Sequence, residues 1–461
     1  IFNEADADSL HVQQADEAYS LGEGRAADTY LNQDKIFAII EQAGIQAVHP
    51  GYGFLSENSD FVKRCEETGV AFIGPTTEQM LSFGLKHTAR QLAEDNNIPL
   101  LPGTGLLESL EQAVSEAEGI GYPLMLKSTA GGGGIGMQLC WNRGELEQAY
   151  DSVRRLSENN FSNSGVFIEK FIEYARHIEV QVFGDGQGKA VAIGERDCST
   201  QRRNQKVIEE TPAPNIADDV RSELHETAVR LVKAVNYRNA GTVEFVYDQK
   251  SDRFYFLEVN TRLQVEHGVT EQVFNIDLVE WMIRLAADEL DDLDVLGGKL
   301  QSTGHAMQAR IYAEDANKQF QPCAGLLSEV SFPAINDPRF NSLPVDSLRI
   351  DHWLETGIEI SPLFDPMLAK IIVTAGDRAT AMSRLDTVLA ETSLYGIETN
   401  ISYVREILGT DDFQQGDIYT RYLNNFVTRP CSIDVISSGT LTTIQDYPGR
   451  TGYWDIGVPP S

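Results

Sequence analysis

The chain has 461 residues, 42% of them hydrophobic, and a formal net charge of −32. This length suffices for about three domains, each with a core. The negative charge argues against nucleic acid and anionic membranes as partners, since both require a basic surface. No apolar run is long enough to span a membrane and no signal-peptide pattern opens the chain, so we expect a cytoplasmic protein.

The cysteines and the first residue give two further expectations. Five cysteines without a repeating spacing predict reduced thiols, as opposed to a disulfide framework or a zinc site. The sequence begins with Ile1 and not with methionine, which we interpret as a partial or trimmed chain.

From Asn32 to about Pro102 the sequence alternates between helical and strand patterns, which predicts a parallel sheet covered by helices. The predicted elements are helices at 35–43 and 58–68 and strands at 45–48 and 70–73. The loop at 49–58 follows the first of these strands, where open α/β sheets place ligands. An ordinary tight turn would explain its proline and glycines equally well.

A smaller unit is predicted at 101–172, with strands at 123–127, 137–141 and 166–172 and a helix at 143–158. The glycine-rich loop at 130–136 has a strand on each side, whereas the P-loop and the dinucleotide fingerprint lead into a helix. Consecutive glycines let backbone N–H groups approach phosphate oxygens, although a flexible linker is the alternative. Lys127 supplies a point charge suited to phosphate. Lys86 is a weaker candidate, since a lone lysine is usually a surface residue.

Positive charge is concentrated at 195–206, where Arg202, Arg203 and Lys206 occur in a very acidic chain. Guanidinium groups match planar oxyanions, so these residues suit bicarbonate or phosphate. A structural network of ion pairs would also explain some of them. We expect at least one of the two arginines to be structural.

The segment 258–266 carries a polar side chain at every second position. If it is extended, these side chains project to one face of a strand. They are Glu258, Asn260, Arg262, Gln264 and Glu266. Two acids, two amides and a guanidinium are unusual on the solvent face of an ordinary strand, and the row therefore predicts a polar site.

A hairpin formed by 242–247 and 254–258 would add a second carboxylate to this face. If its turn centres near Ser251, Glu244 lies opposite Glu258. Like charges directly opposite one another are destabilising, so the pair calls for a cation. With Asn260 nearby, the oxygen ligands favour Mg²⁺ or Mn²⁺ over zinc. For either glutamate alone, a solvated sheet surface is the better interpretation.

Taken in order, these motifs resemble the biotin carboxylases, which are ATP-grasp enzymes. The resemblance covers residues 1–428 and rests on Lys127 with its glycine loop, the segment 195–206, Glu244 and the segment 258–267. It implies a mixed α/β and α+β ATP-grasp fold, and it favours the ligand interpretation of the loop at 49–58. The implied domains are 1–100 (Rossmann-like, lacking the family's first strand), 101–172 (mobile lid) and 173–429 (β-rich).

The resemblance also implies the chemistry. ATP phosphorylates bicarbonate, the resulting carboxyphosphate yields CO₂, and CO₂ carboxylates biotin. Glu266 would be the general base, with Arg262 and Lys206 holding bicarbonate, and Arg349 would stabilise the biotin enolate. The implied metal ligands are Glu244, Glu258 and Asn260. The implied cofactor-binding residues are Tyr52, Lys86, Lys127, Gly131, Gly132, Gly133, Gly134, Gly136, Glu169, Lys170, Ile172, His177, Gln201, Asn204, Gln264 and Val265.

The last residues, 430–461, are too few for a core of their own. They resemble the opening of the carboxyltransferase module that follows the carboxylase domain in urea carboxylase and urea amidolyase. No Ala-Met-Lys-Met biotinylation motif is present, so biotin is expected on a separate carrier domain. The sequence leaves homo-oligomerisation open.

Three alternatives remain at this point. The chain could serve an acyl-CoA or pyruvate carboxylase, it could be a carboxylate–amine ligase that needs no biotin, or it could be an inactive interaction module. Dependence of ATP cleavage on bicarbonate and biotin would distinguish a biotin carboxylase from the carboxylate–amine ligase and from the inactive module.

Overall fold

The computed structural model describes residues 1–128, 136–161, 165–340, 347–428, 432–437 and 440–445. Gly131, Gly132, Gly133 and Gly134 lie outside these ranges, as does the side chain of Lys86. In the part that is described, no helix is both long and apolar enough to cross a membrane.

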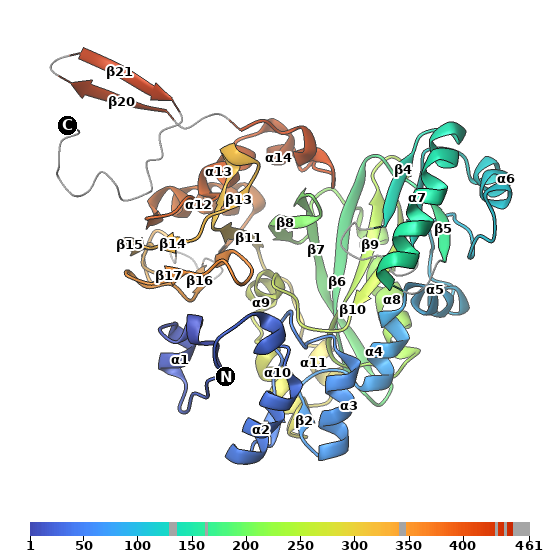
Figure 1. Cartoon of the computed structure of the whole chain (residues 1–461), viewed down its shortest axis with the longest axis horizontal. Helices are drawn as coiled ribbons and strands as arrows, with labels where there is room; N and C mark the ends of the chain where they lie inside the picture. The colour runs from blue at the N-terminus through green and yellow to red at the C-terminus, as the bar shows by residue number, and fades with distance from the viewer. Residues whose placement is uncertain (129–135, 162–164, 341–346, 429–431, 438–439, 446–461) are drawn as a thin grey trace.

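The N-terminal region is a small α/β unit (Figure 1). Its strands β1 (Ala47–Val48) and β2 (Ala71–Phe72) pair in parallel, as the alternating pattern predicts. Asn58 caps α3 (Ser59–Thr68), and Gly69 ends it in the left-handed conformation. The other elements are η1 (Glu4–Asp6), α1 (Leu10–Gln14), η2 (Ala26–Asp28), α2 (Gln33–Ala43), α4 (Thr77–Gly84) and α5 (Lys86–Asp95).

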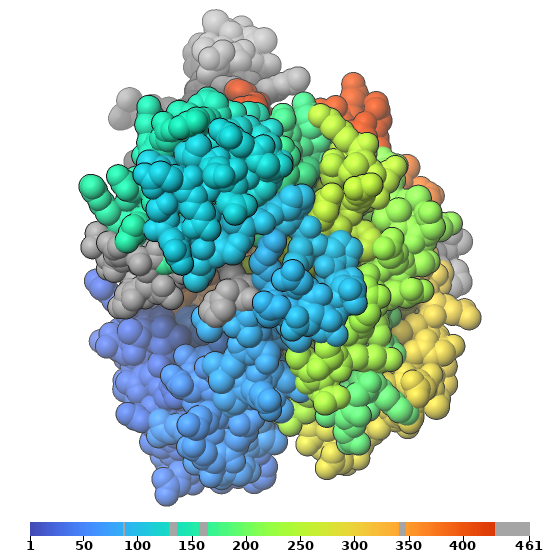
Figure 2. Space-filling model, turned by 90° about the vertical axis from the view of Figure 1, so that its right-hand side faces the viewer, coloured from blue at the N-terminus to red at the C-terminus, as the bar shows by residue number. Residues whose placement is uncertain are grey.

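Residues 101–170 contain a three-stranded antiparallel sheet of order β4-β3-β5. The strands are β4 (Met137–Cys140), β3 (Leu124–Ser128) and β5 (Val166–Lys170), and the helices α6 (Leu110–Ile120) and α7 (Arg143–Phe161) pack on them. Leu124, Leu126 and Ile168 are fully buried in the core between these layers. In Figure 2 this unit forms the lobe at the top of the view.

An eight-stranded antiparallel sheet forms the centre of the molecule, in the order β10-β9-β6-β7-β8-β11-β18-β16. Its strands are β6 (Ala175–Asp185), β7 (Ala190–Arg202), β8 (Gln205–Thr211), β9 (Arg238–Asp248), β10 (Arg253–Asn260), β11 (His305–Tyr312), β16 (Ser347–His352) and β18 (Met367–Ala375). The β9–β10 hairpin thus forms one edge of the sheet and β16 the other.

Helices cover this sheet. Alternating apolar residues of β6 and β9 pack with α8 and α5 in one core, and β11 and β18 pack with α12 and α13 in another. The helices are α8 (Asp218–Lys233), α9 (His267–Phe274), α10 (Leu278–Ala286), α11 (Leu293–Gly297), α12 (Arg378–Glu391), α13 (Ile401–Leu408), α14 (Asp411–Gln415), η3 (Ala316–Lys318) and η4 (Tyr422–Asn425).

Short strand pairs complete the fold. They are β12 (Glu314–Asp315) with β13 (Gln321–Pro322), β14 (Gly325–Leu326) with β17 (Glu359–Ile360), β15 (Glu329–Ser331) with β19 (Ser393–Tyr395), and β20 (Ser432–Ser437) with β21 (Thr440–Gln445). The last hairpin is drawn apart from the main body in Figure 1. The mixed α/β architecture with a large β-rich region agrees with the predicted fold class.

Candidate active site

A cavity of about 560 Å³ lies between the three-stranded sheet and the large sheet. It brings together residues that are as far apart in sequence as Lys127 and Asp365. The predicted site residues that line it are Lys127, Lys170, Ile172, His177, Gln201, Asn204, Lys206, Glu244, Glu258, Asn260, Arg262, Gln264, Val265 and Glu266.

The β9–β10 hairpin has the register that the sequence predicts. Glu244 pairs with Glu258, and a bulge at Leu257 accompanies this pairing. Asn260 Nδ2 and Gln264 Nε2 each donate to Glu244 Oε1, at 2.8 and 2.9 Å. Two carboxylates and an amide therefore face one cavity, which is a ligand set suited to a hard divalent cation.

The extended row stops earlier than predicted, because β10 ends at Asn260. Beyond it, the Thr261 N–H and Arg262 Nε donate to the carboxylate of Glu57, at 3.1 and 2.9 Å, so this side chain of the 49–58 loop takes the place of a strand partner. The expectation that all of 258–266 is one strand is therefore wrong. The polar side chains of 262–266 still line the cavity because the chain folds back into α9.

Lys206 lies at the centre of the acidic cluster. Its Nζ is 2.6 Å from Glu179, 3.1 Å from Glu244 and 2.6 Å from Glu266. Its side chain is only 12% exposed. Burial alone would lower the pKa of Lys206, but the three carboxylates raise it well above its usual value. The ammonium is therefore charged at neutral pH.

Arg310 is a second cation at Glu266 and was not among the predicted site residues. Its Nη2 donates to Glu266 Oε2 at 2.9 Å, and its Nε donates to Glu209. It lines the cavity from β11. The available signal was an arginine within the predominantly apolar segment 305–312, where burial demands a partner for the charge.

Of the three buried glutamates at Lys206, Glu244 and Glu266 have lowered pKa values. Burial would raise the pKa of Glu266, but Lys206, Arg310 and Arg196 lower it well below its usual value. The pKa of Glu244 is likewise lowered, because Lys206 and His177 outweigh the effect of burial. Both carboxylates are therefore ionised at neutral pH and can accept a proton or a cation.

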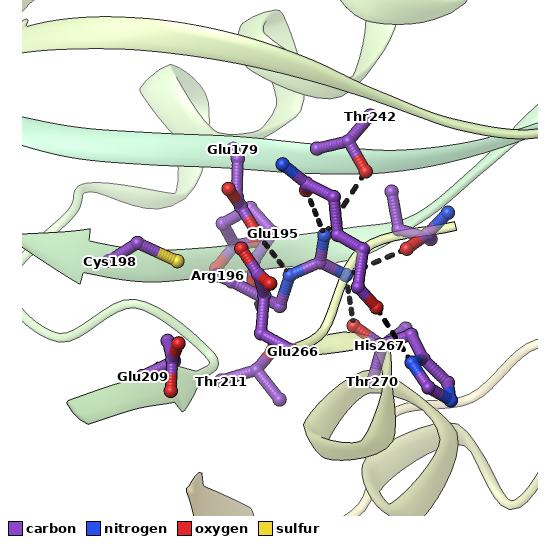
Figure 3. A network of polar contacts seen from close by, with 12 residues as sticks. Glu179, Glu195, Arg196, Cys198, Glu209, Thr211, Thr242, Glu266, His267 and Thr270 are labelled. Atoms are coloured by element: carbon purple, nitrogen blue, oxygen red, sulfur yellow. Dashed lines mark hydrogen bonds and ion pairs between the residues drawn. The ribbon is translucent and has the colours of Figure 1, made fainter. Parts of the chain in front are cut away.

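Arg196 on β7 lies among several of these groups and binds them (Figure 3). It is fully buried and donates to Glu179, to Thr242 Oγ1 at 3.2 Å and to Thr270 Oγ1 at 2.9 Å. It also donates to Gln264 Oε1 at 3.1 Å. With its oxygen held in this way, Gln264 turns its NH₂ group toward Glu244.

The other end of the cavity lies between β5, β6 and the β7–β8 turn. His177 Nε2 is 3.1 Å from Glu244, and Lys170 Nζ donates to the carbonyls of Gly121 and Tyr122, both at 2.9 Å. Arg203 and Asn204 form a two-residue turn with φ of 49° and 68°. Positive φ at both positions is typical of tight hairpins, and the turn brings Asn204 to the cavity wall.

Some expected residues lie elsewhere. Arg349 is not part of the cavity wall. It lies on the edge strand β16 and pairs with Glu271 at 2.6 Å and Asp351 at 2.8 Å, and its place beside biotin stays a prediction. Tyr52 also lies off the wall, with Lys370 Nζ 5.6 Å from its ring centroid, and Gly136 is not in the wall either.

Two further expectations concern charged residues. Glu169 lines a neighbouring cavity and not this one. Arg202 is structural, as we expected for one arginine of the pair, since it donates to Glu314 at 2.7 Å and stacks over the ring of Phe320.

Family models cover most of the chain. Residues 1–80 match the biotin carboxylase N-terminal domain. Residues 86–293 match the ATP-binding domain of the carbamoyl-phosphate synthase L chain. Residues 308–425 match the biotin carboxylase C-terminal domain. The second and third matches include residues that line the cavity, and the first includes Glu57, which contacts the lining residue Arg262.

Biotin carboxylase of Halalkalibacterium halodurans is 42% identical over 426 residues, which cover 92% of this chain and 91% of that protein. The chain belongs to the biotin carboxylase family. A crystal structure of the Campylobacter jejuni family member, described as a beta-gamma-ATP complex, superposes with a TM-score of 0.85 and 39% identity over 92% of both chains.

Urea amidolyase of Saccharomyces cerevisiae is 49% identical over all 461 residues, but this chain spans only 24% of that protein's length. In this relative, the region that is similar to this chain is therefore part of a much longer polypeptide.

Proposed function

We propose that this chain carries out ATP- and bicarbonate-dependent carboxylation of biotin, as the carboxylase region of a urea carboxylase. The observation that carries the proposal is the pair Glu244 and Glu258, which face each other across a hairpin beside the Lys206–Glu266–Arg310 cluster. The cavity therefore combines a place for a divalent cation with a place for an anion.

The residues around Glu244 fit Mg²⁺ or Mn²⁺. Glu244, Glu258 and Asn260 offer oxygen atoms at the cavity wall, and Lys206 balances only part of the negative charge around it. A bound divalent cation would neutralise charge on the phosphates of ATP. Lys127 would contact those phosphates, together with the glycine loop at 130–136 and Lys86. Lys170, Ile172, His177, Gln201 and Asn204 would surround the rest of the nucleotide.

The cluster around Glu266 suits bicarbonate. Lys206 and Arg310 already bind the Glu266 carboxylate, and Arg262 is held nearby by Glu57. Bicarbonate would compete for these cations, and partial loss of them would raise the pKa of Glu266 toward the range useful for a general base. Gln264 and the Val265 backbone would complete the anion pocket. Arg349 would stabilise the negative charge that develops on biotin, and Arg310 would hold the Glu266 carboxylate.

The biotin would arrive on a carrier domain outside this chain. The similarity to urea amidolyase over residues 1–461 supports urea as the final acceptor. A carboxyltransferase domain of the same polypeptide would then complete the reaction, beginning at about residue 430. The boundaries 1–100, 101–172 and 173–429 remain our proposed division of the carboxylase region.

The test is phosphate release from MgATP in the presence of bicarbonate and free biotin. We expect release to fall to background when either bicarbonate or biotin is omitted. Release that needs no biotin would indicate a carboxylate–amine ligase, and absence of MgATP binding would indicate an inactive module.

The acceptor is tested separately in the longer polypeptide. Urea should stimulate ATP turnover, whereas acetyl-CoA, propionyl-CoA and pyruvate should not. Stimulation by an acyl-CoA or by pyruvate alone would reject urea while leaving the biotin carboxylase proposal intact.

A further inference from the structure

One carboxylate joins two cations at the border between two cavities. Glu169 on β5 accepts a hydrogen bond from Arg90 Nη1 to Oε1 at 2.9 Å, and from Lys127 Nζ to Oε2. The side chains of Glu169, Lys127 and Arg90 are 13%, 15% and 27% exposed. A carboxylate in this position is costly to leave without a positive partner.

Lys127 has access to both sides of this border. It lines the candidate active site, and it also lines a second cavity of about 310 Å³ that contains Arg90 and Glu169. A lysine stem is flexible, so its ammonium can exchange one anionic partner for another. Binding of a triphosphate by Lys127 would therefore compete with Glu169.

Arg90, in contrast, is fixed. It lies on α5, which packs against β10, and its Nη2 donates to the carbonyl of Leu101 at 3.1 Å. The backbone next to this carbonyl is tightly packed against β5, because a Cβ atom on Gly103 would lie 2.7 Å from the Ile168 carbonyl oxygen. The Arg90–Glu169 pair can therefore persist while Lys127 moves.

We propose that Arg90 is a positioning residue for nucleotide binding, which keeps Glu169 neutralised so that Lys127 can turn to the phosphates of ATP. The inference rests on the proposed ATP site. Without Arg90, Lys127 would be the one cation on Glu169 among the contacts of the described residues, and leaving it would expose an uncompensated carboxylate. Glu169 would then hold Lys127 more tightly.

The test is the dissociation constant of MgATP, measured by calorimetry on the full chain. We expect Arg90→Met to raise it about fivefold. Arg90→Lys should show a smaller rise, because one ammonium keeps the charge but lacks the fork that reaches both Glu169 and Leu101. In a Glu169→Gln background, Arg90→Met should have little further effect, since no carboxylate then competes for Lys127.

Arg284→Met is the matched control, because Arg284 pairs with Glu280 on the exposed face of α10. It should bind MgATP like the unmodified chain, and thermal unfolding would verify that each variant folds. An equal rise from Arg90→Met with and without Glu169 would make Arg90 merely structural and overturn the inference, as would no rise at all. Failure of the unmodified chain to bind MgATP would instead reject the proposed function itself.

Discussion

Glu209 and Glu210 are neighbours on β8, yet they serve opposite faces of the large sheet. Glu209 accepts from Arg310, whose other nitrogen reaches Glu266 at the cavity. Glu210 is 2.7 Å from His305 and 2.7 Å from Arg378, which also donates to the carbonyls of Phe413 and Gln414. Both glutamates are buried and both bind an arginine.

The two clusters differ in what surrounds the charges. Glu210, His305 and Arg378 do not line the cavity. The pKa of Glu210 is lowered because His305 and Arg378 outweigh the effect of burial. Around Lys206, three carboxylates share one ammonium at the wall of a cavity. Glutamates paired with basic side chains therefore line the candidate site on one face, which we propose is reactive, and form a structural cluster away from that cavity on the other.

The largest expected effect is on the reactive face. Glu244→Gln should reduce phosphate release from MgATP by about a thousandfold, since it removes a carboxylate of the proposed metal pair. Its stability should change by less than about 1 kcal/mol, because Lys206 keeps Glu179 and Glu266. Retained activity in a steady-state phosphate assay would contradict the proposed metal site.

The structural face should respond in the reverse way. Glu210→Ala leaves Arg378 and His305 without their carboxylate and should lower the free energy of unfolding by about 3 kcal/mol. Urea denaturation measures this loss. The KM for MgATP should stay unchanged at a temperature where the variant is folded. A raised KM with normal stability would break the distinction between the two faces.

Two arginines of the large sheet provide a further test of the proposed reactive site. Arg310→Leu should reduce biotin-dependent phosphate release about thirtyfold, since Arg310 binds Glu266 at the cavity. Arg349→Leu should reduce it by about tenfold, because Arg349 is the proposed partner of the negative charge on biotin. A fall of less than about threefold would contradict this role and leave Arg349 as a structural partner of Glu271 and Asp351.

The smallest effect concerns pH. Burial and Lys370 lower the pKa of His267 from 6.5 to about 3, and its Nδ1 donates to the Gln264 carbonyl at 2.7 Å. Between these pKa values the unfolded chain binds a proton that the folded chain does not, so stability is full above pH 6.5 and falls as pH decreases. From pH 7.5 to 5.5 His267 should contribute a loss of about 1 kcal/mol.

Urea denaturation of the unmodified chain and of His267→Gln at both pH values measures this contribution. Glu271, 3.6 Å from His267 Nε2, and the nearby Arg349 and Asp351 are retained in the variant. An unchanged pH dependence in His267→Gln would assign the effect to other groups.

Sequence reasoning succeeded where local geometry determines the outcome. The turn near Ser251 sets the register that places Glu244 opposite Glu258, and Gly69 ends α3 where a left-handed residue was expected. It failed where long-range packing decides. Local patterns do not show that Glu57 replaces a strand partner at Thr261, or that β11 adjoins β8 while β16 lies at the sheet edge. Arg310 was therefore missed.

The contact from Glu57 to Arg262 has a consequence for how the molecule can be divided. Glu57 belongs to the segment 1–80 and Arg262 to the segment 86–293, so the proposed anion pocket depends on a contact across the boundary between these two segments. Cutting the chain between these segments would leave the Glu244–Glu258 pair intact but would remove the Glu57 partner of Arg262. We therefore expect cleavage at this junction to weaken the proposed bicarbonate site more than the proposed metal site.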